Sequence, residues 1–207
     1  MLYTYTDAEG CIDSDLLPIS VLAPTPPNAG VDTNFCLNAI PYPLISGLPI
    51  GGIWTGPGVE YIVPDTTFVP SVAGVGIHEL VYTTGFNTTC ETHDTIQVEV
   101  YSIPTLVIPP DQETCHHDTI SFEATASGGL YPYTWAWYPA VWALVSSSDS
   151  TVTMVPGNPG ATNLYAPVTI EVTDSNNCLV SNWFELTVHP LPVITAGPDT
   201  SICFSPT

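Results

Sequence analysis

The stretch AGVDTNFC at Ala29–Cys36 decides the organisation of this chain, because it returns as AGPDTSIC at Ala196–Cys203 with five of its eight residues unchanged. A looser copy, PDQETC, lies at Pro110–Cys115. The cysteines that end these three copies are 79 and then 88 residues apart. Repeats of this length exceed most solenoid units and are typical of a string of small β domains.

A second series of cysteines keeps the same spacing. Cys11, Cys90 and Cys178 are also 79 and 88 residues apart, and each follows a β-rich run that enters a turn. The two series together predict that each repeat opens near an Asp-x-x-x-Cys motif and closes on a hairpin around its second cysteine.

We therefore divide the chain into four segments. Residues 1–23 are the C-terminal strands of one repeat, 24–103 and 104–192 are complete repeats, and 193–207 begin another. Prolines gather at each boundary, and proline-rich linkers are stiff and extended, which predicts a linear array of domains.

The predicted fold class is all-β. Helical periodicity is nearly absent, whereas short alternating or β-branched runs recur between turns rich in Gly, Pro, Asn and Ser. This pattern predicts tandem immunoglobulin-like β-sandwich domains. The runs occupy residues 76–83, 95–101, 119–125, 131–138, 166–173 and 184–189.

Composition excludes several classes of function. The chain has no lysine and no arginine against 20 acidic residues, a formal net charge of −20. Binding to nucleic acid or to anionic membranes relies on basic side chains, so we expect neither. Trypsin-like proteases also find no cleavage site, which suits long exposure outside a cell.

Cysteine usage points to an extracellular location. Six regularly spaced cysteines indicate an oxidising compartment, where disulfides persist. No run approaches the roughly 18 apolar residues of a membrane helix, and the start of the sequence does not resemble a signal peptide. We expect the targeting signals of a secreted protein to lie outside this sequence.

Independent folding of each repeat favours disulfides within a repeat, Cys36 with Cys90 and Cys115 with Cys178, each adding about 2–4 kcal/mol. Cys11 and Cys203 would then pair outside the sequence. Free or metal-bound thiols remain open, as does pairing across each repeat boundary. The boundary pairs would be Cys11–Cys36, Cys90–Cys115 and Cys178–Cys203.

Two tryptophans are predicted core anchors. Trp54 and Trp135 follow the first cysteine of their repeats by 18 and 20 residues. In immunoglobulin domains a tryptophan on a central strand packs against the disulfide, and its large ring dominates the core. We expect both residues to occupy such positions.

The chain resembles a known family of surface proteins. SGGLYPYTW at Ser127–Trp135 resembles the Gly-Gly-x-x-Pro-Tyr signature and following Trp of SprB-type repeats, found in gliding-motility adhesins of Bacteroidetes. GGIWTGPGV at Gly51–Val59 is similar to another repeat of these secreted proteins, and Tyr5–Cys11 to the closing hairpin of both. The resemblance implies polycystic-kidney-disease-like (PKD-like) immunoglobulin folds in a cell-surface stalk or filament, exported by the type IX secretion system.

The same resemblance implies O-glycosylation, which such bacteria place on Asp-Ser/Thr-x motifs. The matching hydroxyls belong to Thr66, Thr95, Thr119 and Ser150. The competing interpretation is that threonine at Thr95 and Thr119 simply favours a β-strand.

A calcium site is a further hypothesis. Asp7, Glu9, Asp13 and Asp15 crowd one predicted hairpin, and carboxylate oxygens are the ligands that calcium prefers. The alternative is a solvated acidic turn. Motifs typical of enzymes are absent from the sequence, so we expect no catalysis.

These observations favour a structural segment of a long extracellular adhesin or surface filament, which gives reach, protease resistance and display. Its expected partners are neighbouring repeats of the same chain, like filament chains, and glycans. The alternatives are a carbohydrate-binding or spacer module of a secreted enzyme, and a filament subunit that completes its terminal repeats with neighbouring copies by strand addition.

Overall fold

The computed structural model describes residues 1–207 apart from 20, 22, 63, 141–143, 198 and 200–207. The chain is all-β, as predicted, and contains two immunoglobulin-like β-sandwich domains in tandem. The first compact unit comprises Met1–Thr33, Pro41–Ala73 and Ile77–Val98, and the second comprises Asn34–Ile40, Gly74–Gly76 and Glu99–Thr207. Within the described part of the chain, no helix is long and apolar enough to cross a membrane.

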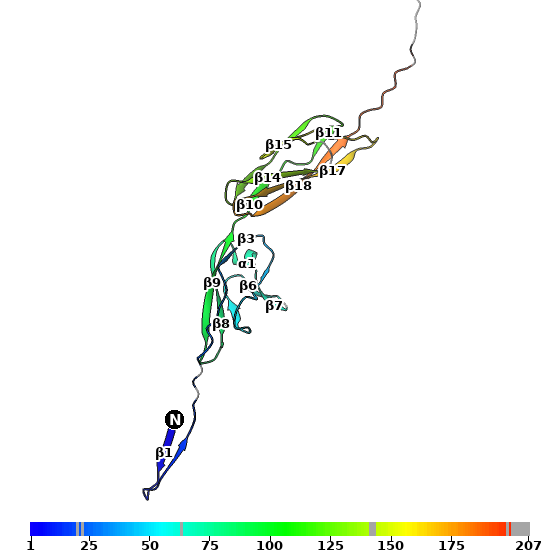
Figure 1. The fold of residues 1–207 in the computed structure, drawn as a ribbon. Coiled ribbons are helices and arrows are strands. Elements are labelled where there is room, and N and C mark those ends of the chain that lie inside the picture. Colours follow the sequence, from blue (N-terminus) through cyan, green and yellow to red (C-terminus); the bar gives the residue numbers. More distant parts are fainter. Residues whose placement is uncertain (20, 22, 63, 141–143, 198, 200–207) are drawn as a thin grey trace, which may run out of the picture. The chain divides into compact units, whose positions relative to one another are not determined.

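The strands up to Tyr101 form a hairpin and two sheets (Figure 1). The hairpin is antiparallel and separate, and the two sheets have the orders β3-β9-β8-β5 and β4-β7-β6. The elements are β1 Leu2–Thr6, β2 Ile12–Leu16, β3 Thr33–Cys36, β4 Tyr42–Pro43, β5 Ile53–Thr55, β6 Val59–Ile62, β7 Asp65–Phe68, α1 Pro70–Ala73, β8 Gly76–Thr84 and β9 Thr92–Tyr101.

The remaining strands form sheets of the orders β11-β18-β17-β14, β12-β16-β15 and β10-β13. The long antiparallel hairpin β17–β18 is the largest element of this part (Figure 1). The strands are β10 Pro104–Val107, β11 Gln112–Cys115, β12 Ile120–Glu123, β13 Thr125–Gly128, β14 Thr134–Pro139, β15 Leu144–Ser148, β16 Thr151–Met154, β17 Leu164–Thr173 and β18 Leu179–His189.

Alternating side chains build the core of each sandwich. Along β9, Ile96, Val98 and Val100 are buried while the residues between them are exposed. The two-residue period of a strand places these side chains on one face, which is why the sequence alternates. The second core is larger and is centred on β17 and β18. Its members are Phe122, Ala124, Trp137, Val152, Met154, Ala166, Val168, Ile170, Phe184, Leu186 and Val188.

Each sandwich also places a short strand parallel to its last long strand, and one aspartate fixes the register. Asp32 Oδ1 accepts the backbone N–H of Gln97 on β9 at 2.8 Å, and Asp111 Oδ1 accepts that of Glu185 on β18 at 2.8 Å. These aspartates are the first residues of the repeated Asp-x-x-x-Cys motif. The motif therefore sets where its cysteine stands along the sheet.

The boundary between the units differs in detail from the boundary between the repeats. The predicted domain 104–192 lies inside the second unit. Asn34–Ile40, which the sequence pattern assigns to the repeat 24–103, is grouped with the second unit as well. The segment that contains Cys36 thus belongs to one repeat by sequence and to the next unit by contact.

Candidate functional site

The structure contains one disulfide among the residues that it describes, between Cys36 and Cys178. Cys36 ends β3 and is half-buried, whereas Cys178 lies in the turn between β17 and β18 and is fully buried. Both belong to the second unit, although 142 positions separate them in the sequence. Cys36 comes from the repeat 24–103 and Cys178 from the repeat 104–192, so this bond joins two repeats covalently.

The predicted pair Cys36–Cys90 does not form, because its members lie at opposite ends of a strand. Leu37, beside Cys36, donates its N–H to the carbonyl of Tyr101 at the end of β9 (2.9 Å), whereas Cys90 precedes Thr92, the first residue of β9. A ten-residue strand spans about 33 Å. Disulfides need Cα atoms within about 7 Å of one another.

The predicted pair Cys115–Cys178 is corrected for the same reason. Cys115 pairs in register with His189 at the end of β18, whereas Cys178 precedes Leu179, the first residue of that 11-residue strand. The three boundary pairs Cys11–Cys36, Cys90–Cys115 and Cys178–Cys203 do not form either, since Cys36 and Cys178 bond to each other and Cys90 and Cys115 are free. Cys11, Cys90 and Cys115 are free and exposed, and Cys203 lies outside the described residues.

A buried carboxylate organises the turn that carries Cys178. Asp174 is 3% exposed, and its Oδ1 accepts the backbone N–H groups of Asn176 and Cys178, each at 2.9 Å. Its Oδ2 accepts the N–H of Leu130 at 2.9 Å. A carboxylate satisfied by three backbone donors can be buried without a basic partner, which this composition requires.

The carboxylate also constrains the loop of the glycine-rich signature. Gly129 has φ +61°, and a Cβ atom at this residue would lie 2.6 Å from Asp174 Oδ2. Glycine is therefore needed both for its backbone conformation and for the close approach. Ser175 adds two bonds to the same loop, from its N–H to the Leu130 carbonyl and from its hydroxyl to the Pro132 carbonyl.

Sequence reasoning missed the role of Asp174, although a signal for it exists. The spacing Asp-x-x-x-Cys occurs at Asp7–Cys11 as well, and Asp7 Oδ1 accepts the N–H groups of Glu9 at 3.1 Å and Cys11 at 2.7 Å. The two turns therefore share one hydrogen-bonding pattern. Asp7, predicted to bind calcium, is the residue that organises the turn of its hairpin.

The other members of the predicted calcium site follow the same pattern of local bonding. Asp13 and Asp15 each accept the backbone N–H of the next residue, Ser14 at 2.9 Å and Leu16 at 2.8 Å. Over the described residues, no three His, Cys, Asp or Glu side chains are grouped so that they could hold a metal ion. The structure thus does not gather Asp7, Glu9, Asp13 and Asp15 into one site.

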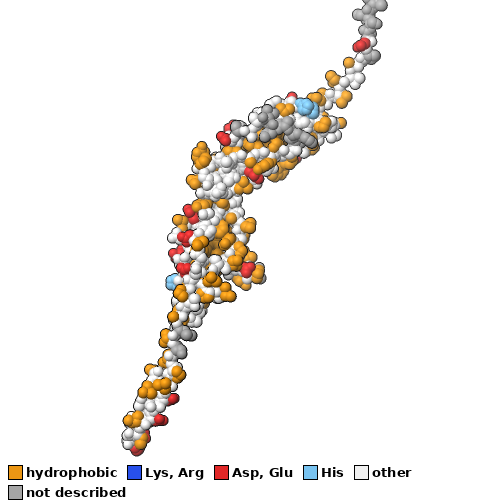
Figure 2. All heavy atoms as spheres, viewed as in Figure 1, with side chains coloured by type: hydrophobic (Ala, Val, Ile, Leu, Met, Phe, Trp, Pro, Cys, Tyr) orange, Lys and Arg blue, Asp and Glu red, His pale blue; other side chains and the backbone are white. Residues whose placement is uncertain are grey.

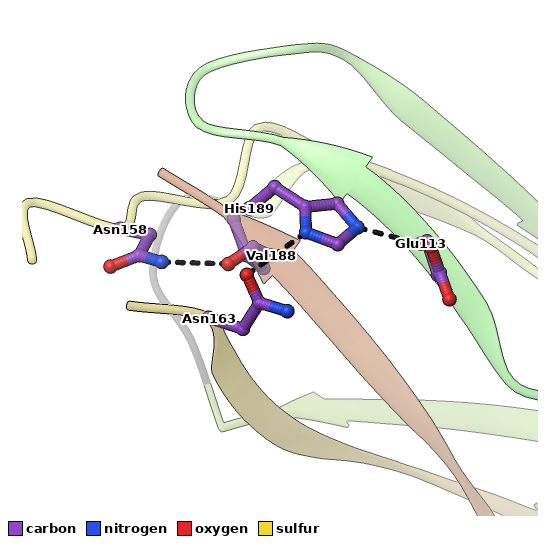
Figure 3. A network of polar contacts seen from close by, with 5 residues as sticks. All are labelled: Glu113, Asn158, Asn163, Val188 and His189. Carbon is purple, nitrogen blue, oxygen red and sulfur yellow. Dashed lines mark hydrogen bonds and ion pairs between the residues drawn. The ribbon is translucent and has the colours of Figure 1, made fainter. Parts of the chain in front are cut away.

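A polar network fixes the far end of β18 (Figure 3), where Cys115 pairs in register with His189. His189 lies between Glu113, whose Oε2 is 3.0 Å from Nε2, and Asn163, whose Oδ1 is 3.0 Å from Nδ1. Asn158, 5% exposed, donates its side-chain N–H to the carbonyl of Val188 at 2.6 Å (Figure 3). These contacts hold β11, and with it Cys115, in register against β18.

The tryptophans occupy different environments. Trp54 on β5 is buried and lies against Tyr82, with 5.0 Å between the ring centroids. Trp135 on β14 is only partly buried at the edge of the second core, while Trp137 is the more buried of the two and donates its indole N–H to the Asp149 carbonyl. Neither predicted anchor adjoins a disulfide within its own repeat.

One face of the second unit has a shallow depression of about 470 Å³. Its walls are formed by the glycine-rich signature, with Tyr131, Pro132, Tyr133 and Trp135, and by the segment at Asp149–Ser150. Tyr131 is 77% exposed, and its ring makes an edge contact with Tyr133 at 5.8 Å. Aromatic faces of this kind can stack on sugars.

The predicted glycosylation residues differ in accessibility. Thr95 on β9 and Thr119 before β12 are exposed, whereas Thr66 on β7 and Ser150 after β15 are half-buried. The carboxylate of Asp94, in the motif of Thr95, accepts the N–H of Ala29 at 2.8 Å. Carboxylates are scattered over the face of the molecule drawn in Figure 2, and no lysine or arginine stands among them, because the sequence has none.

The sequence matches no protein-family model and no curated protein. Among solved structures, immunoglobulin domains 1–4 of Sidekick-1 are 11% identical over 89% of this chain and 56% of that chain, with a TM-score of 0.35. Extracellular domains 3–5 of Drosophila OTK are 11% identical over 79% of this chain and 59% of that chain, with a TM-score of 0.40. The chain thus spans less than two thirds of both fragments.

Fibronectin(III)-like modules of Clostridium thermocellum CbhA are a third similar structure. They are 10% identical over 82% of this chain and 96% of that chain, with a TM-score of 0.34. These similarities concern the fold alone, tandem sandwiches of the immunoglobulin and fibronectin type.

Proposed function

We propose that this chain is a segment of an extracellular stalk or surface filament, of the kind formed by SprB-type adhesins, whose repeats maintain reach under tension. The observation that carries the proposal is the disulfide between Cys36 and Cys178. It links a cysteine near the start of one repeat to a cysteine near the end of the next.

The position of the bond determines how a pulling force passes through the chain. A force that arrives at Cys36 from the N-terminal side crosses the disulfide to Cys178 and leaves toward β18. Residues 37–177, which include β4 to β17, lie in the closed loop and carry no tension while the bond is intact. Most of two sandwiches is then protected from mechanical unfolding by one covalent bond.

Composition supports the same function outside a cell. Structural disulfides persist in oxidising compartments, and a chain without Lys or Arg resists trypsin-like proteases. Its net charge of −20 repels like chains, so side-by-side association requires divalent cations or glycans. We therefore expect neighbouring repeats of one chain to be its main partners.

Single-molecule stretching between the two ends of the chain tests the proposal. Opening the 142-residue loop adds about 500 Å of extended chain, at about 3.6 Å per residue. We expect the oxidised protein to extend less than the reduced protein by this amount, and Cys90→Ser to behave as the wild type. Equal contour lengths before and after reduction would contradict the proposal.

Glycan binding is a second candidate function, favoured by the aromatic depression around Tyr131. Calorimetric titration with neutral oligosaccharides, compared between the wild type and Tyr131→Ala, tests it. Affinity that the substitution abolishes would support a carbohydrate-binding module. Absence of binding to a broad panel would contradict a carbohydrate-binding function.

A further inference from the structure

The two bonded cysteines occupy different positions in the repeat. Cys36 is a strand-end cysteine, at the end of the short strand that runs beside the last strand, and Cys178 is a turn cysteine, in the last hairpin. The equivalent residues are Cys115 as strand-end cysteine of the second complete repeat and Cys90 as turn cysteine of the first. Both are free and exposed.

The strand-end cysteines have the same backbone setting. Leu37, after Cys36, donates its N–H to the carbonyl of Tyr101, the last residue of β9, at 2.9 Å. His116, after Cys115, donates to the carbonyl of His189, the last residue of β18, at 2.8 Å. Cys115 is therefore held in the geometry in which Cys36 forms its bond.

The turn cysteines are also held by comparable bonds. The N–H of Cys178 is accepted by the Asp174 carboxylate, and the N–H of Cys90 is accepted by the Thr88 hydroxyl at 3.2 Å. Each cysteine stands just before the last strand of its sandwich. The two turns differ in chemistry but place their thiols at corresponding points of the fold.

The length of chain at the boundary supplies an independent observation. The repeats vary in length, since the segment Cys36–Cys90 is shorter than the segment Cys115–Cys178. The segment from each turn cysteine to the next strand-end cysteine has a constant length, up to and including Cys203. Only the part of the sequence that crosses a boundary has kept its length.

We propose that Cys36–Cys178 is one member of a series, in which the strand-end cysteine of each repeat bonds to the turn cysteine of the repeat that follows it. Cys115 is then the site for the turn cysteine of a following repeat, and Cys90 the site for the strand-end cysteine of a preceding one. The inference rests on the proposed stalk function and extends it, because such a series carries tension from repeat to repeat through disulfides.

The bond forms by thiol–disulfide exchange. A disulfide oxidant such as oxidised glutathione accepts the two electrons and two protons of a cysteine pair, which yields one protein disulfide and two molecules of reduced glutathione. Exposure of Cys90 and Cys115 leaves both thiols accessible to this exchange.

A chain in which residues 26–192 are duplicated in tandem tests the proposal. Joining Pro192 to residue 26 places the second copy of Cys36 as far after Cys178 as Cys203 stands in the natural sequence. Four substitutions leave two free thiols, Cys115 of the first copy and Cys90 of the second. These substitutions are Cys11→Ser, Cys203→Ser, Cys90→Ser in the first copy and Cys115→Ser in the second. After oxidation with glutathione, a protease that cleaves before aspartate is expected to release residues 111–117 linked to residues 65–93.

The matched control keeps the other two thiols instead, through Cys115→Ser in the first copy and Cys90→Ser in the second. Its remaining Cys90 and Cys115 are expected to be alkylated quantitatively. Alkylation of both thiols in the test chain, with Cys36–Cys178 intact, would overturn the series but leave the stalk proposal standing. Loss of Cys36–Cys178 itself would remove the basis of both.

Discussion

The turns β17–β18 and β8–β9 close equivalent hairpins, yet only the first carries a bonded cysteine. In the first, the buried carboxylate of Asp174 accepts three backbone N–H groups and ties the turn to the glycine-rich loop. In the second, the Thr88 hydroxyl accepts one, and Cys90 remains exposed. The difference shows that this fold can hold the turn cysteine in two ways: buried and bonded in a disulfide, as Cys178 is, or exposed as a free thiol, as Cys90 is.

Removal of the disulfide is the change with the largest expected effect. Cys36→Ser opens a loop of 142 residues and is expected to lower the free energy of unfolding by about 2–5 kcal/mol, because the unfolded chain regains conformational freedom. Denaturant unfolding under non-reducing conditions measures this loss. Cys90→Ser is the matched control, and a comparable loss in that variant would mean that the two turns do not differ as described.

Substitution of Asp174 tests the contribution of the Cys178 turn while both bonded cysteines are kept. Asp174→Asn replaces Oδ2 by an NH2 group, which cannot accept the N–H of Leu130. Because Asp174 is buried, the donor left unsatisfied is expected to lower the free energy of unfolding by about 1–3 kcal/mol. Thr88→Val removes the acceptor of the exposed Cys90 turn and is expected to cost less. Equal shifts in unfolding midpoint for the two variants would contradict the special role of the carboxylate.

The glycine beside the carboxylate gives a smaller, conformational test. Gly129→Ala combines positive φ with a Cβ 2.6 Å from Asp174 Oδ2, and we expect a loss of about 1–2 kcal/mol. Gly157 has open space around it and no positive φ, so Gly157→Ala should leave the thermal midpoint nearly unchanged. An unchanged thermal midpoint in Gly129→Ala would show that the glycine-rich loop and the Cys178 turn are not rigidly coupled.

The pKa values of two tyrosines, Tyr101 on β9 and Tyr138 on β14, give the smallest expected effect. The negative charge of Glu171, followed by their hydrogen bond, raises the pKa of Tyr138, so its phenol stays neutral to a higher pH than usual. The pKa of Tyr101 is raised first by desolvation and only then by Glu99. We expect Glu171→Gln to lower the pKa of Tyr138 more than Glu99→Gln lowers that of Tyr101, as measured by ultraviolet titration; the reverse order would contradict this assignment.

Local periodicity was sufficient to predict the all-β fold, because alternation along β9 and β17 reports directly which face of a strand is buried. The cysteine connectivity was not predictable in this way. It depends on β3 and β11 running parallel to the last strand, which places Cys36 and Cys115 at the end remote from their own turn cysteines. Nothing in the spacing of the cysteines distinguishes a parallel from an antiparallel neighbour.

The candidate site was predictable only in part. The Asp-x-x-x-Cys motif at Asp32 and Asp111 marks residues that matter for the fold. These two aspartates accept backbone N–H groups of a strand distant in the sequence, a contact that local sequence does not show. The carboxylates that crowd the first hairpin favour Asp7 as a calcium ligand. The structure shows that its Oδ1 is engaged by the turn itself.

Peptide mapping of the oxidised chain tests the central claim most directly. Cleavage before aspartate places the four cysteines of the complete repeats in separate peptides, residues 32–64, 65–93, 111–117 and 174–198. We predict that 32–64 is recovered linked to 174–198, with Cys90 and Cys115 alkylated. Recovery of 32–64 linked to 65–93 would contradict a disulfide that joins two repeats.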